Sequence, residues 1–193
     1  MASGSVAVQF FNQTADALSQ QQTSLDQQVV GQVNTLNSLA GQVATLNSRI
    51  AQLEAGGGQA HDMRAQRTQV LEQLAAIGPI RAPEADDGSV RVIFANQILV
   101  EGGMARSVST ADDPVTGFNQ VRIEMGSTTL DISDQLSSGS LGGLIAQRDT
   151  VIAGLRADLD ALAFEVASTV NAQHQVGFGL DGWDDMISVW RDA

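Results

Sequence analysis

A seven-residue repeat of apolar side chains runs through residues 14–54, and no proline interrupts it. One row consists of Val29, Leu36, Val43 and Ile50; the partner row consists of Leu18, Leu25, Leu39, Leu46 and Leu53, with Gln32 as its break. This spacing predicts a helix with a coiled-coil seam. At 1.5 Å per residue such a helix spans about 60 Å, a length that favours a rod or a bundle.

Glycines divide the helical part of the sequence. Three consecutive glycines in "EAGGGQAHD", residues 54–62, favour an end to the first helix because glycine loses the most backbone entropy on ordering. Apolar residues then recur at helical spacing over residues 59–77, and Gly78 and Pro79 end that pattern. The two segments are therefore predicted to form an αα-hairpin.

Residues 80–133 alternate with a period of two, which predicts strands. The segment "SVRVIFANQILVEGG" is rich in Val, Ile and Phe and follows Asp87-Gly88, a turn signal. A second run, "QVRIEMGSTTLDIS", follows "TADDPVTGFN", in which Asp, Pro and Gly favour a reversal. We expect a small antiparallel sheet here, with an aliphatic face that must pack against another element.

The helical repeat returns over residues 141–175. One row holds Ile145, Ile152, Leu159 and Val166, the other holds Leu141, Leu155 and Leu162, and Arg148 and Thr169 are polar exceptions. Two distant heptad segments predict an α+β fold: a long antiparallel helical bundle or coiled coil with a small antiparallel β subdomain inserted between helices. We expect the two stripes to bury one another and the β region to project from one end or side.

Arg148 and two glycines depart from the apolar pattern of this predicted helix. Arg148, if buried, needs a partner from another helix, because the adjacent Asp149 is expected to face elsewhere. "GSLGGLI" precedes a helix but has no lysine and no G-K-[ST] signature, which disfavours a phosphate-binding loop. We interpret Gly142 and Gly143 as joints where another backbone approaches closely, and Ser138 or Ser140 as the helix cap.

Composition excludes several function classes. Asp and Glu number 22 against 10 cations, all Arg, which gives a net charge of −12. This field opposes binding to nucleic acid or to anionic lipid. No apolar stretch reaches the roughly 18 residues of a membrane span, so we expect no membrane insertion. Without cysteine, the chain has no thiolate metal site and no cysteine nucleophile.

No cluster of residues predicts catalysis or a cofactor. His61 and His174 lack metal-ligand neighbours at helical spacing and are interpreted as solvated or capping side chains. The acidic pairs at 86–87, 112–113 and 184–185 lie at turn signals, and no G-x-S-x-G elbow supports a serine nucleophile. We expect no metal, no cofactor and no enzymatic activity.

Several segments, taken in order, resemble a known family. These are "FNQTADALSQQQTSLDQQVVGQVNTLNSLAGQVATLNSRIA", "HDMRAQRTQVLEQLAAI", "EADDGSVRVIFANQILVEGG" and "SGSLGGLIAQRDTVI" with "LRADLDALAFEVASTVNAQHQVGFGLDG". Together they resemble flagellar hook-associated protein 1, the first junction protein between hook and filament. The similarity covers roughly residues 11–182.

The resemblance implies a structural role in the bacterial flagellum. Such proteins are exported without a cleaved signal peptide, remain extracellular, and self-associate between the hook protein and the second junction protein. The resemblance assigns residues 12–77 and 141–176 to a helical bundle domain and residues 78–137 to a β-rich subdomain. A coiled-coil adhesive or binding module of another surface appendage stays open as an alternative function.

The two ends of the chain depart from the family. Residues 1–11 and 177–193 are flanking segments, and the terminal segments that polymerise in the family have no counterpart here. We therefore expect this chain alone to be a monomer or a weak oligomer. In the tail, Trp183, Met186, Ile187 and Trp190 share a helical stripe, which predicts either packing onto the bundle or an exposed anchor.

Overall fold

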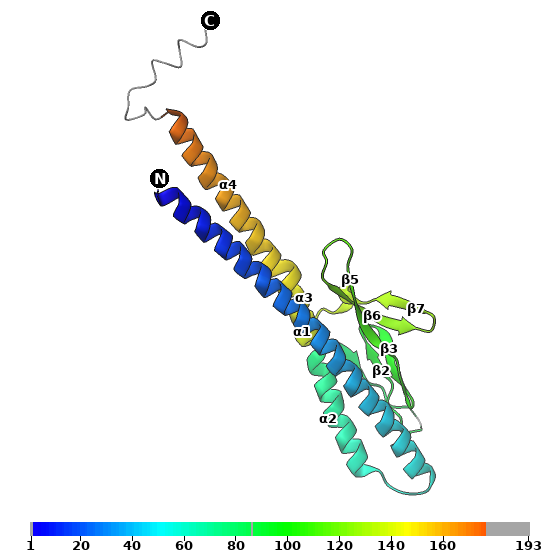
Figure 1. Cartoon of the computed structure of the whole chain (residues 1–193). Helices are drawn as coiled ribbons and strands as arrows, with labels where there is room; N and C mark the ends of the chain where they lie inside the picture. Colours follow the sequence, from blue (N-terminus) through cyan, green and yellow to red (C-terminus); the bar gives the residue numbers. More distant parts are fainter. Residues whose placement is uncertain (1, 86, 177–193) are drawn as a thin grey trace, which may run out of the picture. The chain divides into compact units, whose positions relative to one another are not determined.

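The computed structural model describes residues 2–85 and 87–176, and the side chains of residues 6–85 and 87–173. The chain forms two compact units, Ala17–Ala153 and a second one made of Met1–Asp16 and Gly154–Ala193. The long helix α1, Ala2–Ala55, contributes residues to both units. The predicted α+β class, helices with antiparallel strands inserted between them, is confirmed (Figure 1).

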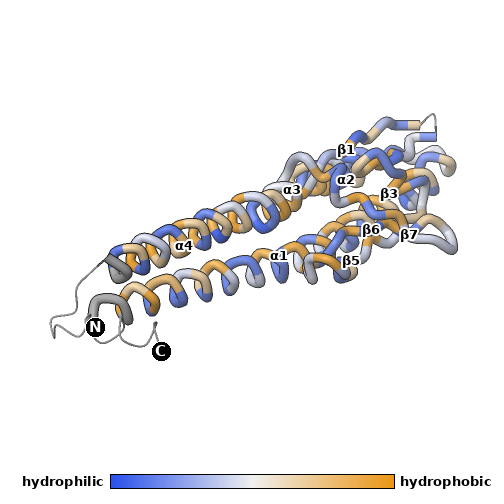
Figure 2. Tube along the Cα trace, turned by 90° about the horizontal axis from the view of Figure 1, so that it is seen from above, coloured by the Kyte–Doolittle hydropathy of each residue, from blue (hydrophilic) through white to orange (hydrophobic). Residues whose placement is uncertain are grey.

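Helix α1 begins earlier than the predicted residue 14, because the segment before it contains no proline and only a single glycine, Gly4. Apolar and polar residues alternate along it turn by turn (Figure 2). Val29, Leu36, Val43 and Ile50 are all fully buried. In the partner row the heptad spacing falls on Gln32, but the buried residue is its neighbour Val33. Leu53 is 40% exposed, because this row leaves the core at the end of the helix.

Helix α2, His61–Ile77, forms the second arm of the predicted αα-hairpin. It starts two residues after the predicted boundary and ends at the predicted one, with Gly78 as its C-cap. In the connecting turn Gly57 has a φ of +80°, a conformation that L side chains rarely adopt. Val70, Leu74 and Ile77 are the buried apolar residues of this helix.

The middle of the chain forms two antiparallel sheets, not the single sheet that the sequence predicted. The first has the order β1-β2-β3-β4, from strands Ile80–Arg81, Val92–Phe94, Gln97–Glu101 and Met104–Ala105. The second has the order β5-β6-β7, from strands Val108–Asp112, Asn119–Met125 and Thr128–Asp131. Val108 pairs with Ile123 and Asp112 with Asn119, which fixes the register of the β5-β6 hairpin.

Strands from both sheets share one hydrophobic core with α1 and α2. The core joins the α1 row to Leu74 of α2, Phe94 of β2, Leu99 of β3 and Ile123 of β6. Figure 1 shows the strands alongside the C-terminal half of α1. The β region therefore lies along one side of α1, and its aliphatic faces find the packing partner that the sequence analysis required, because they cover the α1 stripe.

The predicted C-terminal helix is divided by a change of helical type. After the 3₁₀ turn η1, Ser133–Gln135, come α3, Gly139–Ala146, the π-helical segment η2, Gln147–Ile152, and α4, Ala153–Val176. Ile152 is buried and Leu159 is half-buried. The expected burial of the α4 stripe was wrong for Leu155, Leu162 and Val166, which are 48%, 51% and 38% exposed.

The predicted tail stripe, including Trp183 and Trp190, lies outside the described residues. Within the described part of the chain, no helix has both the length and the apolar character needed to cross a bilayer.

Candidate functional site: buried polar clusters and an open groove

Arg148, in the π-helical segment η2, joins α1 to the second sheet. Its side chain is 5% exposed. Nη1 donates to Asp26 Oδ1 at 2.5 Å and to the carbonyl oxygen of Asn119 at 2.9 Å. Gln22 of α1 donates its side-chain amide to the Arg148 carbonyl at 2.9 Å. The buried partner expected from another helix is therefore Asp26.

Asp149 also binds Arg148, contrary to the expectation that it faces elsewhere. It accepts from Nε at 2.6 Å and from Nη2 at 2.9 Å, because the long guanidinium bends back and offers its second edge. The Phe118 ring centroid lies 5.3 Å from Arg148 Cζ. Burial disfavours the charged form, but the bonds and charges of Asp149 and Asp26 outweigh this, and the pKa of Arg148 lies above its ordinary value.

Asn47 of α1 forms a second buried polar cluster and is 1% exposed. Its amide nitrogen donates to the carbonyl oxygens of Val90 and Gly102, each at 2.8 Å. Its Oδ1 accepts from the Val90 amide at 3.1 Å and from Arg67 Nη1 at 2.9 Å. One side chain thus satisfies backbone groups just before β2 and in the turn between β3 and β4.

Arg67 is held in this cluster by two other groups. It donates to the Gly88 carbonyl at 2.7 Å and pairs with Glu84 at 3.3 Å. Its pKa lies below the ordinary value because burial disfavours the charged form, although Glu84 opposes the effect.

Asn37 of α1 also bonds to backbone groups of a strand, in this case in the second sheet. Its amide donates to the Val108 carbonyl at 2.7 Å, and its Oδ1 accepts from the Val108 amide at 2.9 Å. Asp26, one helical segment earlier, accepts from the Asn119 amide at 2.8 Å. We call Asp26, Asn37 and Asn47 the three α1 anchors. They follow each other at about three helical turns, so they lie on one side of α1.

An ion-pair network lies at the closed end of the αα-hairpin, beside the turn that joins α1 to α2. Arg64 of α2 binds Glu54 of α1 through Nε and Nη2, each at 2.8 Å, and also pairs with Glu84. The Arg64 hydrogen bonds hold the pKa of Glu54 below its ordinary value. All three side chains are partly exposed, so solvent screens the pairs.

The two glycines predicted as joints differ in their surroundings. A Cβ on Gly142 would overlap the carbonyl oxygen of Leu136, so a backbone does approach closely there. A Cβ on Gly143 would meet nothing within 4 Å, so no close approach occurs at that position. Ser138 is the N-cap residue of α3 but makes no side-chain capping bond, and Ser140 donates to Gln32 of α1 at 3.2 Å.

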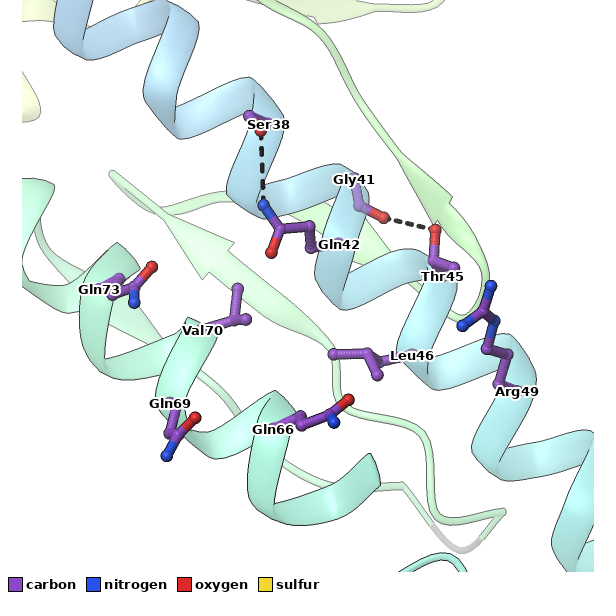
Figure 3. Close-up of a pocket in the computed structure, with 10 residues that line it drawn as sticks. All are labelled: Ser38, Gly41, Gln42, Thr45, Leu46, Arg49, Gln66, Gln69, Val70 and Gln73. Carbon is purple, nitrogen blue, oxygen red and sulfur yellow. Dashed lines mark hydrogen bonds between the residues drawn. The ribbon is translucent and has the colours of Figure 1, made fainter. Parts of the chain in front are cut away.

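An open groove of about 680 Å³ lies between α1 and α2. Figure 3 shows Leu46 and Val70 pointing toward each other from the two helices, with glutamine amides around them. Arg49 lies at the α1 rim beside Thr45. The sequence analysis did not predict this groove, because its residues are polar or small and belong to no recognised motif.

The described residues offer little for catalysis. Within residues 2–85 and 87–176, no group of three His, Cys, Asp or Glu side chains could hold a metal ion. His61 is exposed and its ring is 2.9 Å from Gln59 Oε1, whereas the His174 side chain is not described. The groove contains no acid, histidine or serine in a catalytic arrangement.

Comparison with known proteins identifies the family of this chain. The family described as the flagellar hook-associated protein FlgK helical domain matches residues 1–186. The chain belongs to the FlgK helical-domain family. This confirms the resemblance seen in the sequence.

Known members and one solved structure agree with this family. Flagellar hook-associated protein 1 of Salmonella typhimurium is 30% identical over 179 residues, which are 89% of this chain and 32% of that protein. The Escherichia coli K12 protein of the same name is 30% identical over 193 residues, 95% of this chain and 35% of that protein. The structure of the flagellar hook junction protein FlgK from Burkholderia pseudomallei matches 89% of this chain at 26% identity, with a TM-score of 0.76.

This chain therefore spans about a third of the length of its FlgK relatives. The three α1 anchors lie inside the region that matches the FlgK helical domain. They show how the two sheets are attached to the long helix in this member of the family.

Proposed function

We propose that this chain is a structural part of the junction between hook and filament in the bacterial flagellum, and that it acts by packing and not by catalysis. The observation that carries the proposal is the family match over residues 1–186. The relatives are named flagellar hook-associated protein and flagellar hook junction protein. The buried polar clusters support the proposal, because they attach strands to helix and leave the interior filled.

The partners belong to the same proposal. A junction subunit contacts further copies of itself, the hook protein on one side and the second junction protein on the other. It reaches the cell exterior by flagellar export, without a cleaved signal peptide. The net charge of −12 favours such protein partners over nucleic acid or anionic lipid.

A chimera tests this function. The matching third of the Salmonella typhimurium protein is replaced by residues 1–186 of this chain, and the chimera is expressed in cells that lack the native protein. We expect incorporation at the hook–filament boundary, detected by immunogold labelling, and swimming in soft agar. Export of the chimera without incorporation would overturn the proposal and favour a binding module of another surface appendage.

A further inference from the structure

The groove between α1 and α2 lies on an uncharged surface of a strongly acidic chain. Residues 27–48 of α1 contain no Asp, Glu, Lys or Arg. The α2 side of the groove is formed by Gln66, Gln69, Val70 and Gln73. A neutral surface with an apolar floor at Leu46 and Val70 loses little solvation when another protein covers it.

Arg49 at the rim of the groove has no partner in the described residues. The other arginines among residues 2–85 and 87–176 each make a hydrogen bond or an ion pair. Arg49 makes neither, although acidic residues outnumber arginines two to one in this chain. An exposed, unpaired guanidinium at the edge of a neutral groove favours a partner that carries a carboxylate.

Helix α4 carries a face with matching chemistry. Ala157, Ala161, Phe164 and Ser168 are exposed and fall at i, i+4, i+7 and i+11, so they share one face of the helix. Phe164 is 75% exposed, whereas its neighbours on this face are small. Asp160, one turn before Phe164, is also exposed and makes no ion pair in the described part of the chain.

We propose that this α4 face of one copy of the chain docks in the α1-α2 groove of a second copy. The docked α4 runs antiparallel to α1, so that Phe164 lies over Leu46 and Val70, each 9% exposed, and Asp160 pairs with Arg49. Small residues on both sides, Ser168 on α4 and Gly41 on α1, allow the helices to approach closely. A helix fits the groove between two antiparallel helices in the way that amphipathic helices bind other helical grooves.

The docking is head to tail, because two different surfaces meet. Each copy keeps one free groove and one free α4 face, so the contact continues from subunit to subunit and builds a ring or a helical layer. The inference therefore deepens the proposed function and rests on it. One docked helix buries a small area, so the contact is weak in an isolated pair of chains.

Cysteine cross-linking tests the contact directly, because the chain has no native cysteine. Chains carrying Gln42→Cys are mixed with chains carrying Ser168→Cys under mild oxidation, since the proposed register places these two positions opposite each other. We expect a disulfide-linked dimer of one chain of each kind. The matched control pairs Gln42→Cys with Thr128→Cys, an exposed position on β7. Equal yields from the two mixtures would overturn the proposal.

Charge reversal and removal of the aromatic ring test its chemistry. In sedimentation equilibrium Phe164→Ser should weaken self-association about tenfold, whereas Val115→Ser, which removes a residue that is 88% exposed elsewhere, should not. Arg49→Glu and Asp160→Arg should each weaken it, and a mixture of the two variants should restore association. Failure of the mixture to recover would contradict the Arg49–Asp160 pair.

The chimera separates this inference from the proposed function. Incorporation of the chimera together with undiminished incorporation of its Phe164→Ser variant would overturn the docking and leave the junction role intact. Cross-linking at Gln42 and Ser168 without incorporation of the chimera would overturn the junction role and leave the docking intact.

Discussion

At the scale of single residues, the α1 anchors perform a task that the sequence did not reveal. The heptad rows predicted the buried apolar positions of α1 well, because apolar burial follows spacing. Asn37 and Asn47 resemble other polar residues of a Gln- and Asn-rich helix, and no local signal marks them. Their role depends on strands that lie 43 and 71 residues away in sequence.

Asn47 provides the sharpest test of an anchor. Asn47→Ala removes the side-chain partner of the Val90 amide and of two carbonyl oxygens, and one of the partners of Arg67, so we expect a loss of about 3 kcal/mol in the free energy of unfolding. Asn34→Ala, an exposed change on the same helix, should cost less than about 0.5 kcal/mol. Urea unfolding followed by circular dichroism measures both, and equal losses would contradict the anchor role.

Burial should also separate two arginines that form ion pairs of similar length. Arg148→Ala leaves Asp26 with an uncompensated charge at 15% exposure and should cost about 3 kcal/mol in unfolding free energy. Arg91 pairs with Glu101 at 2.6 Å, but both side chains are 52% exposed, so Arg91→Ala should change stability by about 0.5 kcal/mol or less. Chemical denaturation of the two variants measures whether the buried ion pair contributes more to the free energy of unfolding than the exposed one.

At the scale of elements, turn chemistry predicted some boundaries and missed others. The reversal in "TADDPVTGFN" is present, with Gly117 at a φ of +73° and its amide bonded to the Asp113 carbonyl. The β2-β3 hairpin was missed, because its two turn residues, Ala95 and Asn96, both have positive φ and Ala rarely does. The π-helical segment was missed as well, since it has no signature in side-chain spacing.

Two adjacent glycines of α3 should respond in opposite directions to the same substitution. Gly142→Ala forces a methyl group into the carbonyl oxygen of Leu136, so we expect a loss of about 2 kcal/mol in unfolding free energy. Gly143→Ala meets open space inside a helix and should stabilise the chain by up to about 1 kcal/mol. Thermal melts of the pair measure the two signs, and stabilisation by Gly142→Ala would contradict the close approach.

At the scale of the whole molecule, the sequence predicted the fold class and the family but not the packing. It expected the two helical stripes to bury each other. Residues in the first stripe are buried by strands as well as by α2, because the strands present aliphatic faces that periodicity cannot assign to a partner. The three α1 anchors and the groove could not be predicted, since both depend on which distant segments meet.

Acid should destabilise the chain through carboxylates whose pKa is lowered in the fold. The pKa of Glu54 is lowered by Arg64, and the pKa of Asp87 is lowered by Ser89. A lowered pKa contributes stability above the unfolded value, about 4, and that stability is lost as the pH falls through the folded value. We expect the melting temperature to fall from pH 5 to pH 3.

Substitution of Glu54 assigns part of this dependence to one residue. Glu54→Gln should show a smaller decrease in melting temperature between pH 5 and pH 3 than the native chain. Glu72→Gln, at an exposed position of α2 without an ion pair among the described residues, is the matched control. An unchanged decrease in Glu54→Gln would show that the Arg64 pair does not contribute to acid sensitivity.

The three α1 anchors lie on a single helix, so both sheets are hydrogen-bonded to α1. Separation of either sheet from α1 therefore breaks bonds to that same helix. The amides of Val90, Val108 and Asn119 all donate to anchor side chains. In native-state hydrogen exchange these three protons should report one shared opening event, with similar protection factors. A much faster exchange at Val108 than at Val90 would mean that the two sheets open independently.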